Sequence, residues 1–148
     1  MQKITTFLTF NHQAEEAATL YTSIFKDSKI TRVTRLPTGN AMTVEFELAG
    51  QKYIAMNGGP HFSFATGISL AVSCADQAEI DYLWEQLTAN GGEPGQCGWL
   101  KDPFGVSWQI IPANMGQLLR SDDPARAQRK MAAMMQMHKI EIAILEQA

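Results

Sequence analysis

Residues 97–112 read CGWLKDPFGVSWQIIP and carry the clearest structural signal in the chain. The four residues Asp102-Pro103-Phe104-Gly105 predict a turn, because Asp accepts hydrogen bonds from the backbone ahead of it, Pro presets φ and Gly closes the turn. Residues 106–111 then alternate between the two faces of a strand. One face is expected to carry Val106, Trp108 and Ile110, and the other Ser107, Gln109 and Ile111. The pattern predicts a β-hairpin.

The composition is that of a globular protein. The chain has 148 residues, of which 45% are hydrophobic and 18% charged, and this is enough for one domain with a buried core. A net charge of −3, with no concentrated basic face, argues against nucleic-acid binding. No apolar run approaches the ~18 residues of a membrane span, so no membrane contact is expected. The N-terminus has the pattern of a strand and not of a signal peptide, which favours a cytoplasmic protein.

The two cysteines are expected to be free thiols. Cys74 and Cys97 lie in strand-like segments, and a reducing cytoplasm disfavours a disulfide between them. They lack CxxC spacing, so the sequence does not predict a zinc site.

The first half of the chain predicts the element order β-α-β-β-β. Residues 4–10 are β-branched and aromatic, which is typical of a strand. Residues 13–25 carry apolar side chains at helical spacing, and Asn11 is the expected N-cap. Strand patterns follow at residues 29–36, 42–48 and 51–57.

The second half repeats this order after a loop at residues 58–67. Residues 68–74 predict a strand, and Asp76 is expected to cap a helix that runs to about Leu87 or Ala89. Residues 93–101 form a weaker strand pattern, broken by Pro94 and Gly95, before the hairpin completes the unit. The tripeptide Gln13-Ala14-Glu15 recurs 64 positions later as Gln77-Ala78-Glu79, at the same point of the element order. We therefore expect two copies of one module.

Helices are predicted after Pro112. Residues 113–119 indicate a short helical link, and Asp123 with Pro124 forms a helix start. One long helix is then expected over residues 125–147, with its apolar side formed by Met131, Met134, Met135, His138, Ile142 and Leu145. This helix is expected to pack either on its own domain or on a partner subunit of a homodimer.

Several of these stretches resemble a known family. The matching residues are 4–10 with Gln13-Ala14-Glu15-Glu16-Ala17, then Met56-Asn57-Gly58-Gly59-Pro60, the stretch 98–112, and Pro124-Ala125-Arg126-Ala127. On these residues the chain resembles the PhnB-like subfamily of the vicinal oxygen chelate superfamily, which has the glyoxalase, bleomycin-resistance and dioxygenase fold. The resemblance implies an α+β domain at residues 1–112. Its two βαβββ modules, residues 1–60 and 66–112, would form a curled sheet around a cavity, and residues 113–148 would add C-terminal helices.

The resemblance also implies where a metal would bind. In metal-using members, four strands each supply a His, a Glu or a similar ligand to a divalent ion that activates the substrate. The matching positions here are Thr5, the region Ile54 to Asn57, Ser69 and Gln109. None is His, Cys, Asp or Glu, and neutral hydroxyls and amides bind first-row divalent ions poorly. We therefore expect no metal at this site, and no other cofactor is predicted.

Strand alternation sorts the residues that would line the cavity. The cavity-facing residues are expected to be Thr5, Phe7, Thr9, Ile54, Met56, Ser69, Ala71, Ser73, Ser107, Gln109 and Ile111, with Asn57 at the rim. The candidates for the pocket are Thr5, Phe7, Ser69, Trp99, Gln109 and His61. Gln109 would either orient a ligand through its amide or be satisfied by Ser69 and Thr5. His61 would either act as an acid or base at the cavity mouth or be a solvated loop residue, and no catalytic residue is assigned.

Three functions are compatible with these residues. The leading hypothesis is a PhnB-like protein of unassigned reaction that binds a small organic molecule in a metal-free cavity, as a binding module or a metal-independent enzyme. The second is a metal-dependent lyase or dioxygenase with unusual ligands, such as His61 with Glu45 or Glu47. The third is a structural or interaction protein. Family members are often labelled as a ubiquinone-pathway methyltransferase, but the usual methyltransferase needs a nucleotide-binding α/β sheet with a Gly-rich turn, and the sequence predicts neither.

Overall fold

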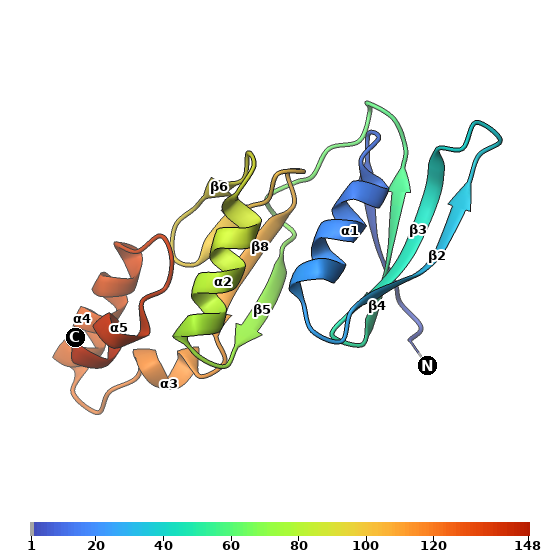
Figure 1. Ribbon diagram of the computed structural model, residues 1–148. Helices are drawn as coiled ribbons and strands as arrows, with labels where there is room; N and C mark the ends of the chain where they lie inside the picture. Colours follow the sequence, from blue (N-terminus) through green and yellow to red (C-terminus); the bar gives the residue numbers. More distant parts are fainter. Residues whose placement is uncertain (1) are drawn as a thin grey trace. The chain divides into compact units, whose positions relative to one another are not determined.

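The structure is a computed structural model that describes residues 2–148, so Met1, the first residue of the expected first module, lies outside the described residues. The chain divides into two compact units, of which the first ends at Ser63 and the second runs Phe64–Ala148 (Figure 1). The elements of the first unit are β1 (Thr6–Phe10), α1 (Ala14–Ile24), β2 (Lys29–Arg35), β3 (Ala41–Leu48) and β4 (Gln51–Asn57). Those of the second are β5 (Leu70–Cys74), α2 (Gln77–Thr88), β6 (Glu93–Pro94), β7 (Trp99–Lys101), β8 (Ser107–Pro112), α3 (Met115–Leu119), α4 (Pro124–Met135) and α5 (Ile142–Gln147).

The first unit is a four-stranded mixed sheet covered by one helix. The strand order is β1-β4-β3-β2, with β1 and β4 parallel and the other pairs antiparallel. Helix α1 lies across one face of this sheet (Figure 1) and buries Tyr21, whose ring centroid is 6.2 Å from that of Phe46 on β3. The opposite face carries the alternate residues of each strand, such as Phe7 and Ile54, which are paired in register.

A strand residue caps helix α1, which corrects the expectation that Asn11 does so. The N-cap position is Gln13, and its side chain makes no capping hydrogen bond. Instead, Asn57 at the end of β4 accepts a hydrogen bond from the Ala14 N–H at 2.8 Å and donates to the Ala41 carbonyl at 2.9 Å. Asn57 was also predicted to lie at the cavity rim. That prediction is wrong, because its amide holds the start of α1 against β3 and β4.

The second unit repeats the topology of the first. Its strand order is β5-β8-β7-β6, again with the first and last strands parallel, and α2 packs on one face through Ile80, Leu83 and Leu87. The bounds of β5 lie 64 residues after those of β1 at both ends, so the spacing of the tripeptide repeat is the spacing of the modules. Asp76 caps α2 as predicted, accepting from the Glu79 N–H at 2.9 Å. The α+β class with two βαβββ modules and C-terminal helices is confirmed.

The turn in residues 97–112 is organised by a buried carboxylate. Asp102 is 3% exposed, and its Oδ1 accepts hydrogen bonds from the N–H groups of Phe104 at 2.9 Å and Val106 at 3.0 Å. Its Oδ2 accepts from the Trp108 indole Nε1–H at 2.9 Å. Gly105 has a φ of +92°, which a residue with a side chain rarely adopts. The predicted hairpin is confirmed, and Asp102 ties its turn to the strand that follows.

The C-terminal segment is two helices and not the expected long one. Helix α4 ends at Met135, residues 136–141 are not helical, and α5 begins at Ile142. The chain leaves the helix because Met137 and Ile140 turn inward to join Leu118 and Leu145 in a small apolar core. Lys130 of α4 is buried and donates to the Leu145 carbonyl, which satisfies the end of α5. The periodicity of the methionines predicted helix correctly up to Met135 but did not show the break.

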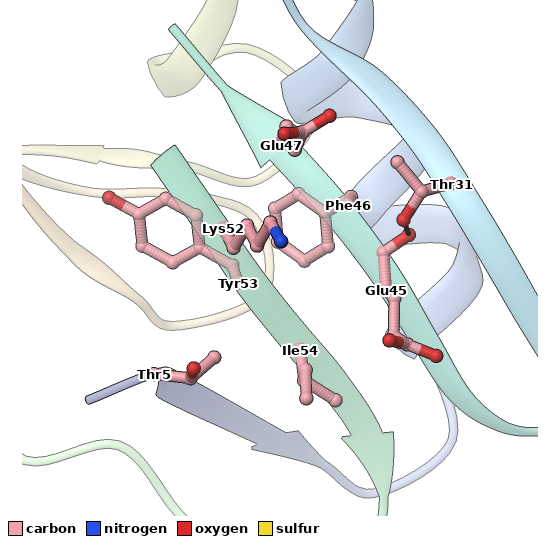
Figure 2. A pocket seen from close by; sticks show the side chains of 8 residues that line it. All are labelled: Thr5, Thr31, Glu45, Phe46, Glu47, Lys52, Tyr53 and Ile54. Atoms are coloured by element: carbon pink, nitrogen blue, oxygen red, sulfur yellow. Dashed lines mark hydrogen bonds between the residues drawn. The ribbon is translucent and has the colours of Figure 1, made fainter. Parts of the chain in front are cut away.

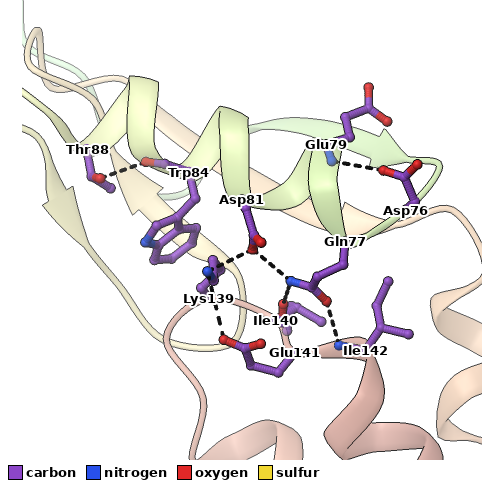
Figure 3. A network of polar contacts seen from close by, with 10 residues as sticks. All are labelled: Asp76, Gln77, Glu79, Asp81, Trp84, Thr88, Lys139, Ile140, Glu141 and Ile142. Atoms are coloured by element: carbon purple, nitrogen blue, oxygen red, sulfur yellow. Dashed lines mark hydrogen bonds and ion pairs between the residues drawn. The ribbon is translucent and has the colours of Figure 1, made fainter.

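This C-terminal segment is held to the second module by hydrogen bonds. The N–H groups of Cys97 and Gly98 donate to the carbonyls of Met137 and His138, each at 2.8 Å. Cys97 therefore lies in a turn with a φ of +58°, and its prediction as a strand residue is wrong. From α2, the Gln77 amide donates to the Ile140 carbonyl at 2.9 Å and accepts from the Ile142 N–H at 2.8 Å (Figure 3).

Candidate functional site

The first unit has a pocket at one end of its sheet (Figure 2). It has a volume of about 320 Å³, and its lining residues are Thr5, Thr31, Glu45, Phe46, Glu47, Lys52, Tyr53 and Ile54. Thr5 lies one residue before β1, so the structure begins this strand later than predicted. The ring of Tyr53 stacks on that of Phe46 with centroids 5.5 Å apart, and burial raises the pKa of the Tyr53 phenol.

The carboxylates of this pocket face basic side chains of β2. Glu47 lies 3.8 Å from the Lys29 Nζ, and Glu45 lies 3.9 Å from the Arg32 Nε. His61 is exposed and is not among the pocket residues. Over residues 2–148, no three His, Cys, Asp or Glu side chains form a group that could hold a metal. The alternative ligand set of His61 with Glu45 or Glu47 therefore finds no support in this geometry.

Phe7 lies on the face of the first sheet that α1 does not cover. It is 54% exposed and pairs with Ile54 of β4. This position agrees with the predicted alternation, in which Phe7 and Ile54 share a face. Of the predicted pocket residues, the first unit holds Thr5, Phe7 and His61, and the second holds Ser69, Trp99 and Gln109.

Three predicted pocket residues come together on the uncovered face of the second sheet. The Gln109 Nε2 donates to the Ser69 Oγ at 2.9 Å, and Trp99 on β7 is the cross-strand partner of Gln109. Trp99 is 37% exposed and Gln109 is partly buried. The contact between Gln109 and Ser69 is the one expected of a Gln109 that is satisfied by its neighbour. The arrangement places an amide, a hydroxyl and an indole side by side.

A second pocket adjoins this group. It has a volume of about 200 Å³, and its lining residues are Thr66, Glu93, Pro94, Gly95, Trp99, Leu100, Lys101 and Ser107. Sequence reasoning placed Ser107 on the correct face but did not select it, and it missed Lys101. The sequence did not give this pairing, because a symmetric turn at Asp102–Gly105 would pair Lys101 with Val106, whereas the structure pairs Lys101 with Ser107.

Comparison with known proteins identifies the family. A family model described as 3-demethylubiquinone-9 3-methyltransferase matches residues 2–111. The chain belongs to this family. The solved structure of the PhnB protein from Bacillus cereus is 34% identical, with a TM-score of 0.70, and the match covers 74% of this chain and 99% of that one. The predicted PhnB-like membership is confirmed.

More distant structures share the fold. Protein PA1353 from Pseudomonas aeruginosa is 18% identical with a TM-score of 0.64, and the match covers 76% of this chain and 98% of that one. The fosfomycin resistance protein FosX from Listeria monocytogenes is 17% identical with a TM-score of 0.60, and the match covers 81% of this chain and 98% of that one. No curated protein matches the chain. Within residues 2–148, no helix has the length and apolar character needed to cross a membrane.

Proposed function

We propose that this protein binds a small organic molecule on the uncovered face of its second module, through neutral hydrogen-bonding groups in place of a metal. The observation that carries the proposal is the bond of 2.9 Å from Gln109 to Ser69, beside the half-exposed ring of Trp99. At this face a polar group of the ligand would meet the amide and hydroxyl, and an apolar part would lie against the indole.

The Gln109–Ser69 pair keeps hydrogen-bonding capacity for a ligand. An amide nitrogen has two hydrogens, and the contact with Ser69 uses one of them. The amide oxygen of Gln109 and the hydroxyl hydrogen of Ser69 complete the set of groups that a ligand could engage. The contact also fixes the orientation of the amide, which lowers the entropy that binding would cost.

The chemistry of these positions supports a metal-independent site. Ser69 and Gln109 occupy two of the positions at which metal-using relatives place ligands, and here they bond to each other. The description of the family names a methyl transfer. The sheets of this chain are two four-stranded mixed sheets, each with one parallel pair, unlike the parallel sheet that holds a nucleotide in the usual methyltransferase. We therefore favour binding of a small molecule, or metal-independent catalysis on it, over metal-dependent catalysis and over methyl transfer.

A thermal-shift screen on chelator-treated protein tests this proposal. We expect at least one small organic compound to raise the melting temperature, and we expect Gln109→Leu to remove that shift. Gln117→Leu is the matched control, because Gln117 is exposed on α3 and the chemical change is the same. Compounds that act only after a divalent metal is restored, or that stabilise Gln109→Leu as well as the wild type, would count against the proposal.

A further inference from the structure

Four side chains form a square on the uncovered face of the second sheet. Trp99 faces Gln109 across the β7–β8 pair, and Lys101 faces Ser107. Facing residues in an antiparallel pair have Cβ atoms about 5 Å apart, and residues two positions apart on one strand share a face. The square therefore joins the Gln109–Trp99 group to the adjoining pocket, of which Trp99, Lys101 and Ser107 are lining residues.

Ser107 brings a hydroxyl to the wall of this pocket. The residue is 4% exposed, and it lines the pocket beside Lys101, its cross-strand partner. A serine hydroxyl can both donate and accept a hydrogen bond, so it is a group that a bound molecule could engage. This observation was not used in assigning the face to a small molecule.

Lys101 and Ser107 place an ammonium and a hydroxyl next to each other at the pocket. Lys101 is exposed, and Glu93, the one acid among the lining residues, faces it from β6. A carboxylate accepts strong hydrogen bonds from both an ammonium and a hydroxyl, so it fits the pair formed by Lys101 and Ser107.

We infer that the ligand is a small carboxylic acid with an apolar or aromatic body, whose carboxylate is bound by Ser107 and Lys101 while its body lies against Trp99. This inference rests on the proposed function and adds the charge class of the ligand and the residue that anchors it. Ser107 is the specificity-determining residue, and Lys101 distinguishes an acid from its neutral amide.

Ligand-detected NMR titrations test the inference with three probes of the same shape: phenylacetate, phenylacetamide and phenethylamine. A panel of aryl and alkyl carboxylates, each paired with its amide, extends the series to other bodies. We expect carboxylates to bind about tenfold tighter than their amides, as one charge-assisted hydrogen bond predicts, and the amine to bind weakest. Amides that bind as tightly as their acids would overturn the charge assignment and leave the proposed function standing. An absence of binding by every member of the panel would overturn both.

Variants test the roles of Ser107 and Lys101 in carboxylate binding. Ser107→Ala is expected to weaken carboxylate binding about fivefold, whereas Ser23→Ala, at an exposed serine on α1 of the first unit, should leave it unchanged. Lys101→Met should remove the preference for acid over amide while leaving amide binding intact. The fold of each variant is checked by its melting temperature. Wild-type affinity in Ser107→Ala, with the fold intact, would overturn the role of Ser107.

Discussion

Asp102 accepts three hydrogen bonds inside the hairpin turn, and its burial makes each of them costly to lose. We predict that Asp102→Ala lowers the free energy of unfolding by about 3 kcal/mol, because it leaves two backbone N–H groups and an indole N–H without their acceptor. Urea denaturation measures the change. Asp122→Ala, at an exposed position, is the matched control and should change stability by less than about 0.5 kcal/mol.

A double-mutant cycle separates the indole bond from the backbone bonds. Trp108→Phe removes the donor that contacts the Asp102 Oδ2, and the cycle cancels the packing that is lost with the larger buried ring. Asp102→Ala should therefore cost less in this background than in the wild type. Equal costs in both backgrounds would show that the indole bond does not contribute to stability.

Cys74 is a buried thiol with a raised pKa. Burial, together with the negative charges of Glu79 and Asp76, raises the pKa of Cys74 to about 12. Because the thiolate is the reactive form, we predict that native Cys74 resists alkylation at pH 8 at least about 100-fold more than the unfolded chain does. The Cys97→Ser variant isolates this thiol, and mass spectrometry after iodoacetamide treatment measures it. Rapid labelling of Cys74 without unfolding would contradict the prediction.

Single residues could be predicted from the sequence where their interactions are local. Asp76 and Asp102 bond to backbone within a few positions, so residue type and spacing identified both. Asn57 could not be identified in this way, because it caps a helix 43 positions away in the sequence. Gln109 was selected by strand alternation, and its contact with Ser69 followed from the parallel pairing of the first and last strands in the family fold.

At the level of elements, Gln77 joins α2 to the C-terminal segment through both atoms of its amide. We predict that Gln77→Ala increases hydrogen exchange at Ile142, and also at Cys97 and Gly98, whose N–H groups donate to the same segment. The increase should be about tenfold or more, because two partly buried hydrogen bonds of roughly 1 kcal/mol each are lost. Gln128→Ala, at an exposed site on α4, is the control. Unchanged exchange at Cys97 and Gly98 would show that the segment is held without Gln77.

The ion pair beside Gln77 gives the segment a dependence on pH. Lys139 contacts Asp81 at 2.7 Å (Figure 3), and hydrogen bonds from Lys139 and Gln77 lower the pKa of Asp81. A lowered pKa means that the folded state binds the proton more weakly than the unfolded state does. The stabilisation is therefore present above the unfolded pKa of about 3.9 and is lost as the pH falls through the folded value.

To measure this dependence, the stability of Lys139→Met is compared with that of the wild type over a range of pH. We expect the wild type to be more stable by less than about 1 kcal/mol at pH 7, since the pair is partly exposed. The difference should shrink as the pH falls below the unfolded pKa of about 3.9 and vanish below the folded one. Lys26→Met, at an exposed lysine, should show no such trend. A difference between Lys139→Met and the wild type that persists in acid would exclude the ion pair as its cause.

Elements were predicted most reliably where their residues repeat. The order β-α-β-β-β was visible twice because alternation, helical spacing and turn residues agreed in both halves. The break between α4 and α5 was not visible, because Met134, Met137 and Ile140 continue an approximately helical spacing although residues 136–141 are not helical. Periodicity records which residues are apolar, and only packing determines where a helix must end.

For the whole molecule, the homodimer that the family resemblance suggests stays a prediction. We expect sedimentation velocity at micromolar concentration to give twice the mass of the chain, with dissociation on dilution. Monomer mass throughout this range would contradict it. The fold could be predicted almost completely because one motif and one internal repeat define it. The ligand could not, because its recognition depends on groups such as the Ser107 hydroxyl, whose place in the pocket wall only the structure shows.

The hydrogen bonds between the C-terminal segment and the turn at Cys97 and Gly98 have a consequence for biosynthesis. A chain leaves the ribosome from its N-terminus, and domains fold as their residues emerge. The first module has all of its strands and its helix by residue 57, so it can fold while the rest is still being translated. The second module has strands of two and three residues in β6 and β7, and the carbonyls that its turn needs come from Met137 and His138. The second module can therefore complete its fold only after residues 137 and 138 have been synthesised, and a nascent chain that stalled before residue 137 would carry one finished module and one unfinished one.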